Sequence, residues 1–152
     1  MHQCVNHVSG IICKLSVRKH NTAGAQAKPG REMQQYKPDS IQINYSLGER
    51  EAEEHLLPMA ADLGVAVLIN RPFRSGRLFS AVAGKPLPDW ATEFAASWGQ
   101  FFLKFIVSHP AVTCAIPATS QPHHMIDNLG AGIGVLPDTA TRQRMADYFE
   151  SI

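Results

Sequence analysis

The chain has 152 residues, 45% of them apolar and 18% charged, with a formal net charge of +1, as expected for one globular domain with its own core. So small a charge gives no reason to expect a nucleic acid or an anionic membrane surface as partner, and no apolar run approaches the roughly 20 residues that span a bilayer. The N-terminus lacks a basic segment followed by an apolar one, so no secretory signal is expected. Three cysteines without a Cys-x-x-Cys pair favour the reducing cytoplasm over a disulfide framework.

Residues 1–30 form the least regular part of the chain and are predicted to be a leader of loop or disordered structure. One short strand is conceivable at residues 11–17, and residues 21–30 are small, polar and interrupted by Gly and Pro. The histidines and cysteines of this leader match no zinc-ligand spacing; they are His2, Cys4, His7, Cys13 and His20.

From Arg31 onward the pattern becomes regular. A strand is predicted at Ile41–Tyr45. Glu49–Leu63 has apolar residues at helical spacing, with Pro58 expected to kink or divide the helix. A glycine at position 64 ends it, and residues 65–69 form a continuous apolar strand of the kind buried on both faces of a parallel sheet.

The second half begins with a long loop at residues 70–85. A helix then runs from Pro88 to His109 and presents one aromatic face, expected to be core; this face consists of Trp90, Phe94, Trp98, Phe101, Phe102 and Phe105. A buried strand at residues 112–116 leads into a helix that ends near Ala131. A last helix, capped at Asp138, points Met145 and Phe149 inward.

Alternating strands and helices predict an α/β fold with about three parallel strands joined by right-handed crossovers. Ligands of such folds bind at the carboxyl ends of the strands, and all three ends here are polar: residues 44–46, 70–73 and 118–120. The third end opens a helix, so its backbone N–H groups and positive helix end favour an anion, in particular a phosphate.

Five segments carry a resemblance to a known family: Gln42–Ser46, Asn70–Phe73 with Gly76, Ser97–Leu103, Ile116–Ser120 and Asp127–Asn128. In this order and at this spacing they resemble the C-terminal part of an aldo-keto reductase, over residues 31–152, whereas residues 1–30 carry no such pattern. The resemblance implies a partial (β/α)8 TIM barrel comprising its sixth to eighth strands. It also implies NADP(H) or NAD(H) as cofactor and reduction of carbonyls to alcohols as the family reaction.

The resemblance implies cofactor-binding roles for nine residues. Gln42 matches the glutamine that bonds the nicotinamide carboxamide, and Asn70 stands where many members stack an aromatic ring on the nicotinamide. Arg71, Phe73 and Gly76 match the segment that covers the pyrophosphate.

The remaining positions lie on the adenosine side of the cofactor. Thr119 and Gln121 fall at the adenosine 2′-phosphate, and Asn128 at the adenine. His124 replaces an arginine that many members place on the 2′-phosphate. Because imidazole is a poorer phosphate partner than guanidinium, the choice between NADPH and NADH stays open.

No catalytic residue is assigned, because the family tetrad of Tyr, Lys, Asp and His lies on the first half of the barrel. Tyr36 and Tyr45 are not candidates: the first precedes the matched strands and the second has no lysine partner. No metal site is assigned either, since the adjacent His123 and His124 point in different directions and Cys114 is expected in a buried strand.

Three interpretations remain open: an NAD(P)H-dependent reductase present as a truncated chain, a non-catalytic dinucleotide-binding module, and a gene fragment or degraded copy with no role of its own. A small carbonyl substrate would bind only if the missing half-barrel were supplied. A partial barrel also leaves parallel sheet edges exposed, which predicts either a marginally stable monomer or association with a second copy or another fragment.

Overall fold

The computed structural model describes residues 27–152. The possible strand at residues 11–17 and the histidines and cysteines of the leader lie outside the described residues. The first helix, α1 (Ala27–Tyr36), begins before Arg31, so the predicted leader extends too far: residues 27–30 are helical.

Three parallel strands form one sheet in the order β1-β2-β3, as predicted. They are β1 (Ser40–Asn44), β2 (Ala66–Asn70) and β3 (Cys114–Ala115). β1 pairs with β2 from Ser40↔Ala66 to Asn44↔Asn70, and β2 pairs with β3 through Leu68↔Cys114 and Ile69↔Ala115. The predicted third strand of five residues is therefore reduced to two paired residues, and Cys114 is half-buried rather than buried.

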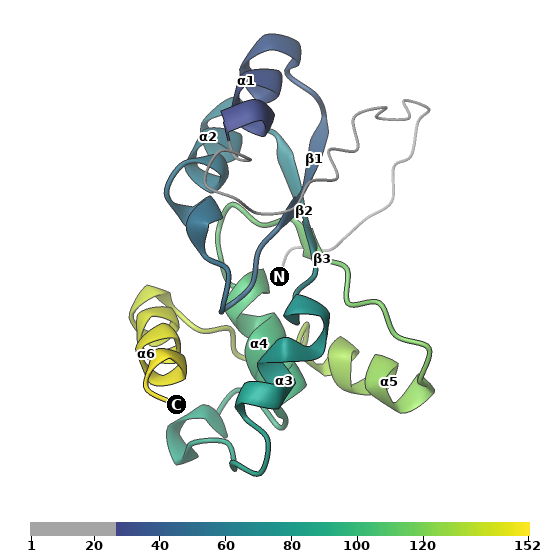
Figure 1. The fold of residues 1–152 in the computed structure, drawn as a ribbon, viewed down its shortest axis with the longest axis vertical. Helices are drawn as coiled ribbons and strands as arrows, with labels where there is room; N and C mark the ends of the chain where they lie inside the picture. The colour runs from purple at the N-terminus through teal and green to yellow at the C-terminus, as the bar shows by residue number, and fades with distance from the viewer. Residues whose placement is uncertain (1–26) are drawn as a thin grey trace.

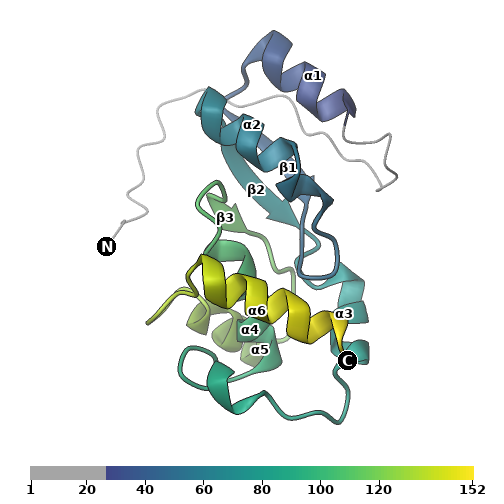
Figure 2. The same ribbon diagram turned by 90° about the vertical axis from the view of Figure 1, so that its left-hand side faces the viewer.

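The helices cover one face of the sheet (Figures 1 and 2). Burial alternates along β1 and β2: Ile41, Ile43, Val67 and Ile69 are buried in the core, while Gln42 and Leu68 on the other face are half-buried. The prediction that the second strand is buried on both faces is wrong. Helices from the described residues supply cover on one side only.

The segment between β1 and β2 forms two helical pieces, as predicted, but the division precedes Pro58. A 3-10 turn, η2 (Glu51–Glu53), is followed by α2 (Leu56–Leu63). Pro58 lies in the first turn of α2, where its missing N–H costs no intrahelical hydrogen bond. Gly64 ends α2 in the left-handed conformation, with φ of 67°, as a terminating glycine should.

The predicted loop of residues 70–85 contains a 3-10 turn, η3 (Arg74–Gly76), and a short helix, α3 (Arg77–Ala81). The predicted long aromatic helix is also divided, into η4 (Asp89–Ala91) and α4 (Trp98–Val107). Ser97 begins α4: its Oγ accepts a hydrogen bond from the Gln100 backbone N–H at 3.1 Å. An N-cap serine thus starts a new helix where apolar spacing alone predicts continuity.

The helix α4 lies among α3, α5 and α6, in the half of the molecule away from α1 and α2 (Figure 1). Seven of its residues are buried, so it is apolar on nearly every side, as expected of a helix surrounded by protein. The predicted aromatic face packs there: the Phe101 ring lies 5.9 Å from that of Trp90 and 5.2 Å from that of Trp98.

The last two helices are α5 (Pro122–Gly130) and α6 (Thr139–Glu150). Asp138 caps α6 as predicted, its carboxylate accepting from the Thr141 N–H at 2.8 Å; this hydrogen bond lowers the pKa of Asp138. Met145 is fully buried and Phe149 packs against the core, which confirms the predicted inward face. Across residues 27–152, no helix is both long and apolar enough to cross a bilayer.

Candidate functional site

A cavity of about 920 Å³ opens at the carboxyl ends of the strands and between α4 and α5. Eight of the nine predicted cofactor-binding residues line it: Gln42, Asn70, Arg71, Phe73, Gly76, Thr119, His124 and Asn128. The ninth, Gln121, is exposed and precedes the first residue of α5; its backbone N–H donates to the Thr119 Oγ1 at 3.1 Å. The topology therefore brings residues 42 and 128 to one site, because the strands all end at the same rim.

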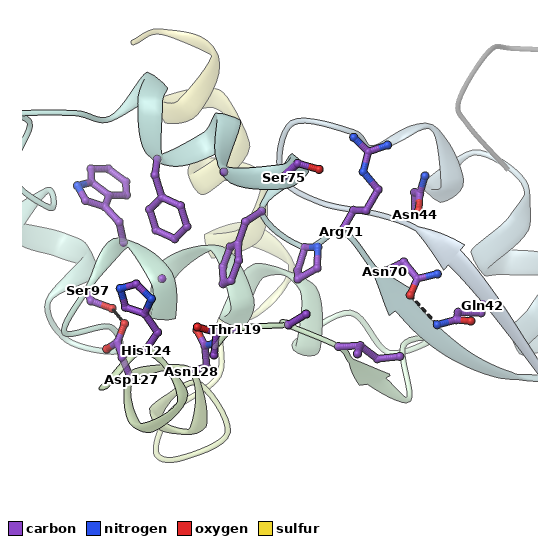
Figure 3. A pocket seen from close by; sticks show the side chains of 18 residues that line it. Gln42, Asn44, Asn70, Arg71, Ser75, Ser97, Thr119, His124, Asp127 and Asn128 are labelled. Carbon is purple, nitrogen blue, oxygen red and sulfur yellow. Dashed lines mark hydrogen bonds between the residues drawn. The ribbon is translucent and has the colours of Figure 1, made fainter. Parts of the chain in front are cut away.

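One end of the cavity is lined with amide side chains. Gln42 and Asn70 occupy neighbouring strands, and the Gln42 Nε2 donates to the Asn70 Oδ1 at 2.6 Å. Asn44 lies beside them, and Arg71 follows directly after β2 (Figure 3). This end therefore offers both hydrogen-bond donors and acceptors to a polar guest.

Among the described residues, Arg71 is the one Arg or Lys that lines the cavity. It is half-buried, and within residues 27–152 its guanidinium makes no hydrogen bond or ion pair with another side chain. A guanidinium held at a cavity without a carboxylate partner is suited to an anion from solution.

The backbone after β2 is strained. Arg71, Arg74 and Ser75 have φ values of 51°, 48° and 56°, in the left-handed region that costs a non-glycine residue about 1 kcal/mol or more. Gly76 follows with φ of 88°, which glycine adopts without that cost. Such strain is concentrated where a loop must present groups to a ligand.

The opposite end of the cavity is formed by α4 and α5 (Figure 3). Ser97, Asp127, His124 and Asn128 meet there, and the Ser97 Oγ donates to the Asp127 Oδ2 at 2.6 Å. The rings of His123 and His124 contact each other with centroids 4.2 Å apart. Among the described residues no group of three His, Cys, Asp or Glu side chains is placed to hold a metal ion.

The walls between the two ends are apolar or aromatic and include Phe79, Trp98 and Ile116. Sequence reasoning gave no part in ligand binding to these three side chains, nor to Asp127 at the α4–α5 end. Trp98, Ile116 and Asp127 lie within the segments that carry the family resemblance, so that signal was present. Phe79 has no such signal, because it lies in the region predicted to be a loop. The helix α3, which was not predicted, brings its side chain to the cavity.

The two tyrosines that were excluded as catalytic acids lie away from the cavity. Tyr36 is 59% exposed on α1, and Tyr45 is fully buried. The Tyr45 hydroxyl donates to the Glu53 carboxylate and accepts from the Arg142 Nη2 at 2.6 Å. Burial in the core, followed by the hydrogen bond to Glu53, holds the pKa of Tyr45 well above its usual range.

Comparison with solved structures identifies the fold. An aldo-keto reductase from Bacillus halodurans in its holo form matches with a TM-score of 0.60 and 18% identity, over 80% of this chain and 46% of that one. An aldo/keto reductase from Klebsiella pneumoniae, in complex with NADP and acetate, matches with a TM-score of 0.60 and 22% identity, over 72% and 39%. The thermostable aldo-keto reductase Tm1743 matches with a TM-score of 0.57 and 16% identity, over 82% and 52%.

The chain thus spans about half the length of the solved structures it matches, and its fold is that of part of a (β/α)8 barrel. The model of the aldo/keto reductase family matches residues 2–143. This match begins well before Arg31, so the expectation that residues 1–30 carry no family pattern is wrong. On the strength of a match over most of its length, the chain belongs to the aldo/keto reductase family.

Proposed function

We propose that this chain binds the adenosine and phosphate part of a nicotinamide dinucleotide, NADP(H) or NAD(H), in the cavity between the strand ends and α5. The observation that carries the proposal is Arg71: a half-buried guanidinium at a cavity, with no side-chain partner within residues 27–152. The Klebsiella pneumoniae structure, which matches this fold, contains NADP.

The rest of the cavity supports the same guest. Phe79 and Trp98 supply aromatic surface for a purine ring, and the hydroxyl of Thr119 lies next to the N-terminus of α5, the positive end of that helix. A cavity of about 920 Å³ lies in the range of small-molecule sites.

The nine predicted residues would divide the cofactor between them. Gln42 and Asn70 would face the nicotinamide, and Arg71, Phe73 and Gly76 the pyrophosphate. Thr119, Gln121, His124 and Asn128 would face the adenosine phosphate and the adenine.

We further propose that the chain does not transfer hydride to a carbonyl by itself, because no tyrosine within residues 27–152 lines the cavity. Among the described residues Tyr45 is engaged with Glu53 and Arg142, and neither Tyr36 nor Tyr148 lines the cavity. A small carbonyl substrate would then require further βα units from outside residues 27–152. On this view the chain is a dinucleotide-binding part of a reductase.

Titration of the purified chain with NADPH, NADH and 2′,5′-ADP tests the binding proposal, and Trp98 in the cavity wall provides a fluorescence signal. Arg71→Gln is expected to weaken 2′,5′-ADP binding by about tenfold or more, the usual effect of losing a charge-assisted hydrogen bond. Thr119→Ala and Asn128→Ala should weaken it as well. The matched control is Arg77→Gln, in the same region but exposed and outside the cavity lining.

Absence of binding by the wild-type chain at about millimolar ligand, a very weak affinity, would refute the proposal, as would equal losses for Arg71→Gln and Arg77→Gln. The statement on catalysis has its own test. Loss of NADPH absorbance that depends on an added aldehyde or ketone would show that the chain is a complete reductase.

A further inference from the structure

The helix α5 is held in an unusual way for a helix that forms a cavity wall. None of its residues is fully buried, and three of its apolar side chains, Met125, Ile126 and Leu129, are 46%, 72% and 64% exposed. Yet His124 and Asn128 on this helix face the cavity. Apolar packing against the described residues therefore does little to fix the helix, and polar contacts must do so.

Asp127 makes those contacts with the first turn of α4. Its Oδ2 accepts from the Ser97 Oγ at 2.6 Å, and its Oδ1 accepts from the Gln100 Nε2 at 2.9 Å. Ser97 in turn accepts from the Gln100 backbone N–H, and the Gln100 Oε1 accepts from the Ala96 N–H at 3.0 Å. The carboxylate thus lies at the positive end of α4, which favours its charge.

Two glycines make room for this network. A Cβ on Gly99 would lie 2.8 Å from the Asp127 Oδ2, and a Cβ on Gly130 would lie 2.5 Å from the Gln100 Nε2. Each helix therefore has a glycine where the other helix sends its polar side chain. Neither glycine has the positive φ that would itself require glycine, so the requirement is for space.

We propose that Asp127, with Ser97 and Gln100, is a positioning residue that holds α5 against α4 and so places His124 and Asn128 in the cavity. The three side chains are called the α4–α5 clamp. The effect of the clamp on ligand binding rests on the proposed function, whereas its effect on the position of α5 does not.

Gln100 of the clamp and Gly130, which faces it, both lie outside the cavity, so variants at these positions separate positioning from direct ligand contact. Gln100 and Gly130 are not among the lining residues. Gln100→Met removes the donor to Asp127, and Gly130→Ala forces a methyl group against Gln100. Both variants are expected to increase hydrogen exchange of the α5 amides and to weaken 2′,5′-ADP binding, each by about tenfold, as for loss of a hydrogen bond to a charged group.

The matched control is Gln143→Met. Gln143 donates to the Asp147 Oδ1 at 2.7 Å on the exposed side of α6, so this variant breaks the same kind of bond away from the cavity. Exchange of the α5 amides and the affinity for 2′,5′-ADP should both stay at wild-type values.

The conservative variant Gln100→Glu tests the clamp through the pH dependence of ligand binding, which a loss of packing would not change. It keeps the shape of the side chain but sets a second carboxylate against Asp127, so binding should weaken at neutral pH and recover as the pH falls and one carboxylate takes up a proton. His123, His124 and Lys104 are the other titratable groups on these two helices; because they are common to both chains, the ratio of variant to wild-type affinity isolates the clamp.

Unchanged α5 exchange in Gln100→Met would overturn the proposal. So would weaker binding without faster exchange, since that result would assign Asp127 or its neighbours a direct contact. If the wild-type chain fails to bind 2′,5′-ADP, the proposed function is refuted, and the exchange measurement alone still decides whether the clamp holds α5.

Discussion

Tyr45 is the residue whose chemical role depends most on where the fold places it. It directly follows the first strand of the sheet, β1, and its ring packs on Phe105 at 5.9 Å and against His109 at 6.0 Å. Its hydroxyl joins Glu53 and Arg142, which also form an ion pair at 2.8 Å. The residue is therefore a structural link between β1, η2 and α6, and no part of the cavity.

Tyr45→Phe is predicted to lower the free energy of unfolding by about 1 to 2 kcal/mol, because it removes hydrogen bonds to charged groups while leaving Glu53 and Arg142 paired. Urea unfolding measures this loss. Tyr36→Phe, at a side chain that is 59% exposed, is the control and should change nothing. An unaltered affinity for 2′,5′-ADP in Tyr45→Phe is also expected, and a large loss would contradict the placement of Tyr45 outside the site.

The same variant has a pH signature. Burial raises the pKa of Tyr45, so below pH about 10 the hydroxyl is protonated in both the folded and the unfolded chain. Above that pH the unfolded chain loses the proton first and the wild type loses stability. The advantage of the wild type over Tyr45→Phe should therefore shrink by about 1.4 kcal/mol per pH unit above pH about 10, measured by urea unfolding across that range. A constant difference would mean that the hydroxyl is not buried.

At the scale of elements, the ends of helices are determined by single residues. Ser97 starts α4 and Asp138 starts α6 through side-chain hydrogen bonds, while Gly64 ends α2 through its left-handed backbone. These three positions need no tertiary contact to act, which is why Asp138 and Gly64 were predicted correctly from the sequence.

Gly64→Ala is predicted to destabilise the fold by about 1 to 2 kcal/mol, the cost of a left-handed conformation for a residue with a side chain. A Cβ at Gly64 would meet no atom within 4 Å, so strain of the backbone is the sole expected cause. Gly132→Ala is the control, since its Cβ would make only an ordinary contact, 3.5 Å from the Leu129 carbonyl oxygen. Equal melting temperatures for the two variants would contradict the assignment.

In the connection between α5 and α6, the backbone carbonyls of Ile133 and Val135 point toward α4, while the side chains of these two residues are exposed. Lys104 is buried in α4, with 1% exposure, and its Nζ donates to the carbonyl oxygens of Ile133 and Val135 at 2.6 and 2.9 Å. Burial lowers the pKa of Lys104. Because their carbonyls turn toward the lysine, Ile133 and Val135 leave their side chains 72% and 70% exposed.

At the scale of the whole molecule, the described residues form an open part of a closed fold. The chain spans about half the length of the solved structures it matches, and the sheet here is covered on one face. Apolar side chains are exposed on α5 and on the connection that follows it. Exposed apolar surface of this kind drives association.

Self-association therefore remains our prediction for the purified chain, with a sedimentation coefficient that rises with concentration. Replacing both Ile133 and Val135 by Lys should weaken the association by about tenfold or more, because each buried aliphatic side chain contributes about 1.5 to 3 kcal/mol. Their carbonyl contacts to Lys104 are made by the backbone and should survive. Ala140→Lys on α6, also exposed, adds a charge while replacing only a methyl group and is the control. A monomer at every concentration would refute this prediction. The location of the protein in the cytoplasm is a separate prediction and also remains one.

The sequence by itself determined what depends on near neighbours in the chain: the order of strands and helices, the end of α2, the start of α6, and the polar ends of the three strands. It also determined the family, because the residues that carry the resemblance keep their order and spacing. The tertiary structure decided what depends on distant pairs: the Gln42–Asn70 hydrogen bond, the burial of Tyr45 between Glu53 and Arg142, and the closeness of α4 and α5 at Gly99 and Gly130. Local periodicity specifies which face of a helix is apolar, but only packing specifies which partner that face meets and how close the two helices come.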